Sequence, residues 1–148
     1  MNYIIRQAER GDLPAIFELV KALAFYEREP ESVTATIENY YDDFDAGIFA
    51  ALVAEMDNEV VGMALYHFAY STWRGRMMYL EDFYVLENKR RFGIGQQLFD
   101  VFLKVAKEQK CVLTKWQVLD WNTPAQQFYE KNNAILEKNW WNGKLFLH

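Results

Sequence analysis

This 148-residue chain has few of the residues that build disulfide frameworks or flexible linkers. It contains one cysteine, three prolines and seven glycines. Cys111 cannot form an internal disulfide, and no group of cysteines and histidines has the spacing of a metal site. No apolar run reaches the roughly 18 residues that a membrane-spanning helix needs. Residues 1–6 lack a basic stretch followed by an apolar stretch, so we expect no signal peptide and a cytoplasmic location.

The charge balance is acidic. A net charge of −5 disfavours a nucleic-acid surface and is compatible with cationic ligands. Half of the residues are hydrophobic and 17% are aromatic, which is ample material for a packed core. No internal repeat, low-complexity tract or linker divides the sequence, so we expect one domain over residues 1–148.

Hydrophobic spacing predicts strands and helices that alternate along the chain. The predicted strands are residues 3–6, 48–54, 60–68, 77–85, 112–119, 134–136 and 144–147. Helices are expected after Asp12 and Ser32 as N-caps, after the turn that ends at Gly95, and from Asn122 or Thr123 through Tyr129. Hairpins in the first half and helices between later strands indicate a mixed α/β sheet.

The most informative segment runs from Leu80 to Gln96 and reads as strand, basic turn and helix. Amide N–H groups of such a turn and the positive end of the following helix point at one spot, which suits a phosphate or a diphosphate. Gly93 and Gly95 would let the backbone approach a ligand closely. A tight strand-to-helix connection would use the same glycines. The Walker and dinucleotide-binding patterns are both absent.

Arg90-x-x-Gly93-x-Gly95 after an apolar strand resembles the acetyl-CoA pyrophosphate loop of the GNAT acetyltransferase superfamily. Further segments are similar to the diamine (spermidine/spermine-type) N-acetyltransferases of that superfamily. These segments are Ala24–Glu27, Tyr66-x-Phe68, Tyr70–Gly75, Tyr79–Val85, Asp120-Trp121-Asn122-x-Pro124 and Phe128–Tyr129. The resemblance covers nearly the whole chain in the expected order and spacing.

The resemblance implies a GNAT-type α/β fold, in which a central mixed, mostly antiparallel twisted sheet of six to seven strands is flanked by about four helices. It also implies acetyl-CoA as co-substrate, no metal, and a homodimer. The residues implied to bind acetyl-CoA are Phe83, Tyr84, Val85, Arg90, Arg91, Phe92, Gly93, Ile94, Gly95, Gln96, Asn122, Pro124, Ala125 and Tyr129. Family loops carry glycine where Arg91 and Asn133 stand. Arg91 would still offer its amide N–H, and Asn133 tolerates left-handed backbone.

Acyl transfer to an amine requires removal of a proton from the amine, stabilisation of the carbonyl oxygen and protonation of the leaving thiolate. By resemblance, Glu81 accepts the amine proton through water and a backbone N–H near Val85 holds the carbonyl oxygen. A half-exposed strand carboxylate is the alternative for Glu81. Because neighbours on a strand alternate, we expect Glu81 and Asp82 to point to opposite faces, so that only one of them faces a given cleft.

By resemblance, Tyr129 protonates the leaving thiolate, which a phenol with a pKa near 10 can do; a core tyrosine is the alternative. The residues implied to contact the amine are Tyr26, Glu27, Glu81, Asp82 and Trp116. The cationic Lys115 is unusual beside a polyamine. We expect His67 and His148 to be structural.

The sequence therefore predicts an N-acetyltransferase for a small diamine or polyamine, with direct transfer in a ternary complex. A lysine-like acceptor such as thialysine is an alternative. A non-catalytic acyl-CoA-binding module is a third possibility, which the presence of both Glu81 and Tyr129 disfavours. We expect neither nucleic-acid nor membrane partners.

Overall fold

The computed structural model describes residues 2–147, which fall into two compact units divided between Trp116 and Gln117. The first unit contains β1 (Tyr3–Gln7), α1 (Leu13–Tyr26), α2 (Ile37–Asp45), β2 (Ala50–Met56), β3 (Glu59–Ser71), β4 (Gly75–Val85), α3 (Ile94–Glu108) and β5 (Leu113–Lys115). The second unit contains α4 (Thr123–Lys131). One domain over residues 1–148 stays a prediction.

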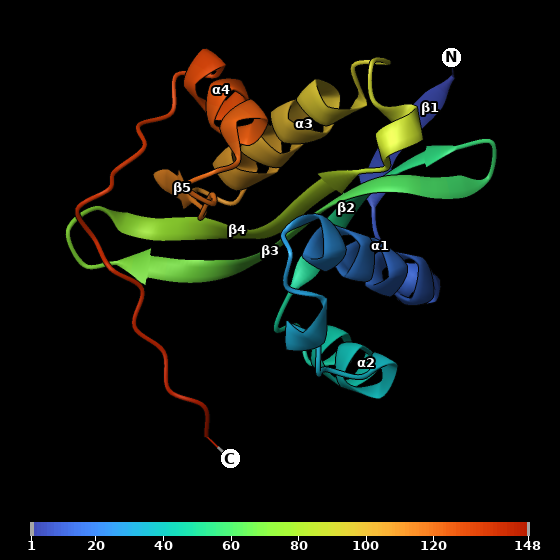
Figure 1. Ribbon diagram of the computed structural model, residues 1–148, viewed down its shortest axis with the longest axis horizontal. Helices are drawn as coiled ribbons and strands as arrows, with labels where there is room; N and C mark the ends of the chain where they lie inside the picture. Colours follow the sequence, from blue (N-terminus) through green and yellow to red (C-terminus); the bar gives the residue numbers. More distant parts are fainter. Residues whose placement is uncertain (1, 148) are drawn as a thin grey trace. The chain divides into compact units, whose positions relative to one another are not determined.

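The first unit is built on one sheet with the strand order β1-β2-β3-β4-β5. The pairs from β1 to β4 are antiparallel, and β5 lies parallel to β4. Figure 1 shows α3 on one side of this sheet and α1 with α2 on the other. The predicted class, a mixed and mostly antiparallel α/β sheet flanked by about four helices, is confirmed.

The strand count differs from the expected six to seven, because the described residues form five strands. Residues 134–136 and 144–147 form no strand, and the strand predicted over 112–119 is reduced to Leu113–Lys115. This strand pairs with β4 over only three residues. Strand propensity alone does not create a strand where no partner backbone completes the ladder.

Alternation along the strands gives the sheet two distinct faces, which we call the α1 face and the α3 face. On the α1 face, side chains of α1 pack against strands β2 and β3 in one buried cluster. Its members are Leu13, Ile16, Leu19, Ala51, Val53, Met63 and Leu65. On the α3 face, Phe102 packs against Tyr66 of β3, and Phe99 packs against Phe83 of β4, with ring centroids 5.6 and 5.9 Å apart.

Helix α2 begins one turn later than the sequence suggested. Its N-cap is Thr36, whose hydroxyl accepts a hydrogen bond from the amide of Asn39, while the Asn39 side chain accepts one from the Thr36 amide. Ser32, the predicted cap, ends a short 3-10 turn, Pro30–Ser32. A reciprocal pair satisfies two backbone donors at once, which a lone serine cannot do.

Gly62 of β3 pairs with Val85 at the end of β4 and leaves no room for a side chain there. A Cβ at this position would lie 3.1 Å from Cγ2 of Val85 and 3.2 Å from the carbonyl oxygen of Tyr84. We therefore expect Gly62→Ala to lower the free energy of unfolding by about 1–3 kcal/mol through overpacking. Denaturant unfolding measures this change. Gly11→Ala is the matched control, since nothing lies within 4 Å of its Cβ position, and an equal loss in both variants would contradict the explanation.

Candidate active site

Strand β4 loses its neighbour on one side halfway along its length. β5 pairs only with Met77–Tyr79, so within residues 2–147 no strand flanks residues 80–85 on the side away from β3. The amide of Leu86 donates to the carbonyl of Val61 on the β3 side, at 2.9 Å. Because backbone polar groups alternate along a strand, the N–H of Val85 points to the other side. We call this side the open edge of β4.

A turn rich in amide groups follows the open edge and leads into α3. A 3-10 segment, Glu87–Lys89, comes first. Gly93 then adopts a left-handed conformation with φ +76°, and nothing lies within 4 Å of its Cβ position. Gly95 sits where a Cβ would be 4.0 Å from Phe83 and Val85. The first amides of α3 have no intrahelical acceptor and point out of the helix end, as an anion site requires.

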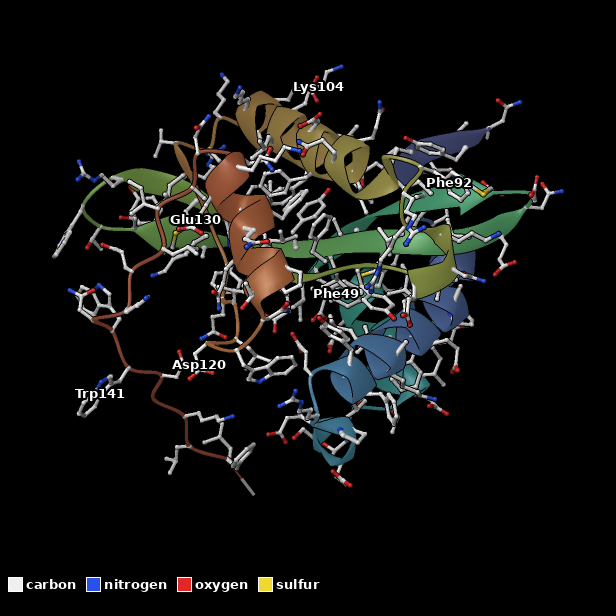
Figure 2. All side chains as sticks on the ribbon, turned by 45° about the horizontal axis from the view of Figure 1, so that its top comes forward. Phe49, Phe92, Lys104, Asp120, Glu130 and Trp141 are labelled. Atoms are coloured by element: carbon white, nitrogen blue, oxygen red, sulfur yellow. The ribbon has the colours of Figure 1, made fainter. Side chains whose placement is uncertain are left out.

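Three consecutive residues of the turn are exposed to solvent. They are Arg90, Arg91 and Phe92, and Figure 2 shows Phe92 at the turn that precedes α3. Arg91 takes the left-handed conformation, with φ +81°, which explains why a glycine suits this position. In the second unit Asn133, the other position where glycine was expected, has φ +68°.

Arg90 connects the predicted cofactor turn with a predicted substrate residue. Its Nε donates to the carbonyl oxygen of Val85 at 3.0 Å. The guanidinium carbon lies 5.3 Å from the ring centre of Tyr84 and 5.9 Å from that of Tyr26, at the end of α1. The structure therefore places a cation beside Tyr26.

A β-bulge overturns the expected orientation of the two adjacent carboxylates. His67 pairs with Tyr79, yet Leu65 pairs with Asp82, so β4 has one residue more than β3 across this stretch. Paired residues share a face, and His67 and Leu65 share one as well, so Tyr79 and Asp82 both lie on the α1 face. Glu81 lies there too, because its Oε1 is 3.6 Å from Nε2 of His67. The prediction of opposite faces was wrong, because alternation fails at a bulge.

Two neighbouring carboxylates act on Asp82 on this face. Burial, together with the charges of Glu81 and Glu27, raises the pKa of Asp82 to about 7. Burial also raises the pKa of Glu27. The pKa of Tyr40, on α2, rises to about 12 through burial and the charges of Asp82 and Glu81. Asp82 is thus about half protonated at neutral pH, whereas Glu81 is exposed to solvent.

Trp116 lies on the opposite face from these carboxylates. Its ring meets that of Phe99, from α3, edge-on with the centroids 5.7 Å apart. The structure therefore joins Trp116 to the aromatic cluster of the α3 face. Tyr26 and Glu27 lie at the end of α1, and the charge of Glu27 reaches Asp82.

Four predicted site residues belong to the second unit. Asn122 is the N-cap of α4, as predicted, and its side-chain oxygen accepts a hydrogen bond from the amide of Ala125 at 3.3 Å. Pro124 occupies the first turn, where its missing N–H costs nothing. Tyr129 is 6% exposed and packs against the ring of Phe128.

Sequence reasoning missed two residues that face the carboxylates. Tyr40 lies on α2, for which the sequence predicted a helix but no site residue. His67, which we expected to be structural, stacks its ring on that of Tyr79, and its Nε2 lies 3.6 Å from Oε1 of Glu81. No local pattern signals either residue, because both are brought to β4 by pairing or packing. The same prediction for His148 lies outside the described residues.

None of the helices within residues 2–147 combines the length and the apolar character that spanning a membrane requires. The same residues include no group of three or more histidine, cysteine, aspartate or glutamate side chains placed to hold a metal ion.

The left-handed backbone at Arg91 predicts a stabilising substitution. A side chain in this conformation costs about 1–2 kcal/mol, whereas glycine adds about 0.5–1 kcal/mol of chain entropy. We expect Arg91→Gly to raise the free energy of unfolding by up to about 1 kcal/mol in denaturant titrations. Lys89→Gly, at a position without positive φ, should lower it instead. The same sign of change in both variants would contradict the assignment.

The raised pKa of Asp82 predicts a pH-dependent cost to stability. The unfolded carboxyl titrates near pH 4, so the folded state binds its proton more tightly between about pH 4 and 7, and stability falls as pH rises through that window. Asp82→Asn removes this loss and should be more stable than the wild type at pH 8, by at most about 4 kcal/mol. The difference should shrink toward pH 4. Asp43→Asn, exposed on α2, is the control, and an equal pH dependence there would contradict the prediction.

Comparison with known proteins relates this geometry to a family. The sequence model of the Acetyltransferase (GNAT) family matches residues 4–134. An aminoglycoside acetyltransferase from an uncultured soil metagenomic sample, solved with trehalose, superposes with a TM-score of 0.82 at 19% identity, covering 99% of this chain and 97% of that one. Aminoglycoside N-acetyltransferase AAC(6')-Iy in complex with CoA gives 0.77 at 18% identity, covering 97% and 95%.

Two curated relatives are more similar in sequence. Thialysine N-epsilon-acetyltransferase of Bos taurus is 36% identical over 141 residues, which are 88% of this chain and 83% of the relative. Spermidine/spermine N(1)-acetyltransferase-like protein 1 of Homo sapiens is 32% identical over 145 residues, 91% of this chain but 21% of the human protein. These matches confirm the predicted class of acetyl-CoA-dependent N-acetyltransferase, and the chain belongs to the acetyltransferase (GNAT) family.

Proposed function

We propose that this chain transfers the acetyl group of acetyl-CoA directly to a primary amine of a small diamine or polyamine. The observation that carries the proposal is the set of carboxylates on the α1 face, in which the charges of Glu81 and Glu27 act on Asp82. Tyr40 and Tyr79 add aromatic faces beside them. Negative charge and aromatic rings together suit an extended aliphatic cation.

The turn and the open edge of β4 fit the diphosphate and the amide-containing arm of coenzyme A. Amides at Ile94 and Gly95 open a 15-residue helix, and a left-handed Gly93 keeps the approach clear. Acetyl-CoA supplies the activated acetyl group. The flanking contacts are assigned, on the resemblance, to Phe83, Tyr84, Val85, Arg90, Arg91, Phe92, Gln96, Asn122, Pro124 and Ala125.

The carboxylate set would handle the proton of the incoming ammonium. An alkylamine with a pKa near 10 arrives protonated at neutral pH and must lose a proton before it can attack. Glu81 accepts this proton through water, since it is the exposed member of the adjacent pair. Asp82, with its pKa of about 7, adds a second negative charge as the pH rises.

Tyr129 and the Val85 amide complete the proposed chemistry. The N–H of Val85 points to the open edge and holds the carbonyl oxygen as charge develops on it. Tyr129 donates its phenolic proton to the departing sulfur. The assignment of Tyr129 and the substrate role of Trp116 rest on the resemblance. The homodimer and the cytoplasmic location likewise stay predictions.

A lysine-like acceptor such as thialysine is the second candidate. The thialysine N-epsilon-acetyltransferases of Bos taurus and Sus scrofa match 83% and 92% of their own length. An amino acid also needs a cation for its carboxylate, and Arg90 places a guanidinium beside Tyr26. A polyamine has no carboxylate for that cation to bind.

One assay separates the candidates. The protein is incubated with acetyl-CoA and, in turn, spermidine, spermine, putrescine, lysine, thialysine and a lysine peptide, and free thiol is followed. Release with polyamines alone supports the first function, and release with amino acids alone supports the second. Binding of coenzyme A by calorimetry without thiol release would overturn both in favour of a binding module.

Replacing the tyrosine hydroxyl tests the proposed acid. We expect Tyr129→Phe to lower kcat about 100-fold or more, because general acid catalysis contributes on that scale. Acetyl-CoA affinity, measured by calorimetry, should stay within about twofold. Tyr70→Phe, on the exposed end of β3, is the control. Equal losses of turnover and affinity in Tyr129→Phe would make Tyr129 a binding residue only.

A further inference from the structure

The strand order sets the direction in which an acceptor can extend on the α1 face. On the function proposed above, the reacting amine lies at the open edge of β4, on the side away from β3. Glu81 and Asp82 lie on the α1 face of β4, so a cationic acceptor extends from the open edge across this face. Neighbouring strands are about 4.8 Å apart, which places β2 about 10 Å from β4. The far end of an extended acceptor therefore lies toward β3 and β2.

Tyr40, on α2, reaches this far end. Its ring centre is 4.8 Å from that of Phe17, on α1, and 5.8 Å from that of Phe49, which directly precedes β2. Tyr40 also packs against the buried cluster of the α1 face, in which Leu65 of β3 pairs with Asp82 of β4. Two ring contacts thus hold Tyr40 in place, and it approaches Asp82 from the side of β2, opposite to the open edge.

The charge around the Tyr40 hydroxyl is negative. The charges of Asp82 and Glu81, together with burial, raise the pKa of Tyr40 to about 12. The phenol therefore keeps its proton near neutral pH, and its oxygen can still accept a hydrogen bond. An ammonium at this position would donate to the hydroxyl oxygen, lie near two carboxylates and meet the face of an aromatic ring.

The neighbouring Tyr41 has a different environment. The guanidinium carbon of Arg10 lies 4.3 Å from the centre of the Tyr41 ring, and Arg10 is also paired with Asp45 at 3.1 Å. A cation of the protein itself therefore already covers this ring. Because Tyr41 is on the same helix and has the same side chain, it provides a matched control for Tyr40.

We propose that Tyr40 recognises a second cationic nitrogen of the acceptor, at the end that is not acetylated. The hydroxyl oxygen accepts an N–H of this ammonium, and the ring stabilises its charge. The site thereby selects acceptors with two amines at the ends of an aliphatic chain over monoamines. A lysine-like acceptor meets the same requirement through its α-amino group. Tyr40 contacts the acceptor away from the reacting atoms, so it determines specificity and takes no part in proton transfer.

Selectivity between two matched acceptors tests this role. Putrescine is compared with pentylamine, in which a methyl group replaces the second amine. We expect the wild type to prefer putrescine, and Tyr40→Phe to lower kcat/KM for putrescine about 10-fold through KM, since a hydrogen bond to a charged group is lost. For pentylamine, kcat/KM should stay within about twofold, as should KM for acetyl-CoA. Tyr41→Phe should keep the wild-type selectivity.

Further arms of the experiment keep the outcome decisive. If thiol release identifies thialysine as the acceptor, its analogue without the α-amino group takes the place of pentylamine. Tyr40→Leu, which keeps an apolar side chain, replaces Tyr40→Phe if circular dichroism shows that the latter fails to fold. Equal losses for both acceptors, or unchanged selectivity in the Tyr40 variant, would overturn the inference, as would a wild type without preference. Wild-type protein that acetylates no amine would overturn the proposed function itself.

Discussion

The site depends on the point at which β4 stops being an interior strand. Its ladder with β5 ends at Tyr79, while its ladder with β3 continues to Val85. A strand that is paired on one side and open on the other offers a row of backbone groups without losing its own position. The helix that follows then presents further amides at the end of this row. The end of the β4–β5 ladder at Tyr79 therefore produces both the open edge and the row of backbone groups that leads to the turn.

The bulge in the same strand determines which face Glu81 occupies. Regular alternation would place Glu81 on the same face as Phe83 and Val85. After the bulge, Phe83 and Val85 lie against α3. At the bulge itself, Glu81 and Asp82 lie together on the α1 face. Placing like charges side by side in a partly buried site costs free energy. Burial and the neighbouring charges therefore raise the pKa of Asp82. A cationic ligand would relieve this cost, which links the electrostatics of the α1 face to the charge of the proposed acceptor.

Local sequence predicted the features that neighbouring residues determine. The turn glycines, the Asn122 cap and the start of α1 all follow from side chains within a few positions of one another. Long-range pairing determined the rest. The bulge cannot be seen without knowing that Leu65 faces Asp82, and Tyr40 and His67 reach the site from separate elements. The two expected terminal strands failed for the same reason, since their strand propensity was visible but the absence of a pairing partner was not.

Because of the bulge, the number of residues in the β3–β4 hairpin determines which side chains reach the site. Between the tip near Gly75 and the bulge, every residue of β4 keeps its face only because one surplus residue is absorbed at Glu81. Deleting that residue would restore regular pleating with the same pairing, so Tyr79, Leu80 and Asp82 would keep their faces while the α1 face would lose Glu81. Distant relatives aligned across this hairpin should therefore be compared by residue count as well as by identity, because a one-residue gap here separates chains that share a fold from chains that share a site.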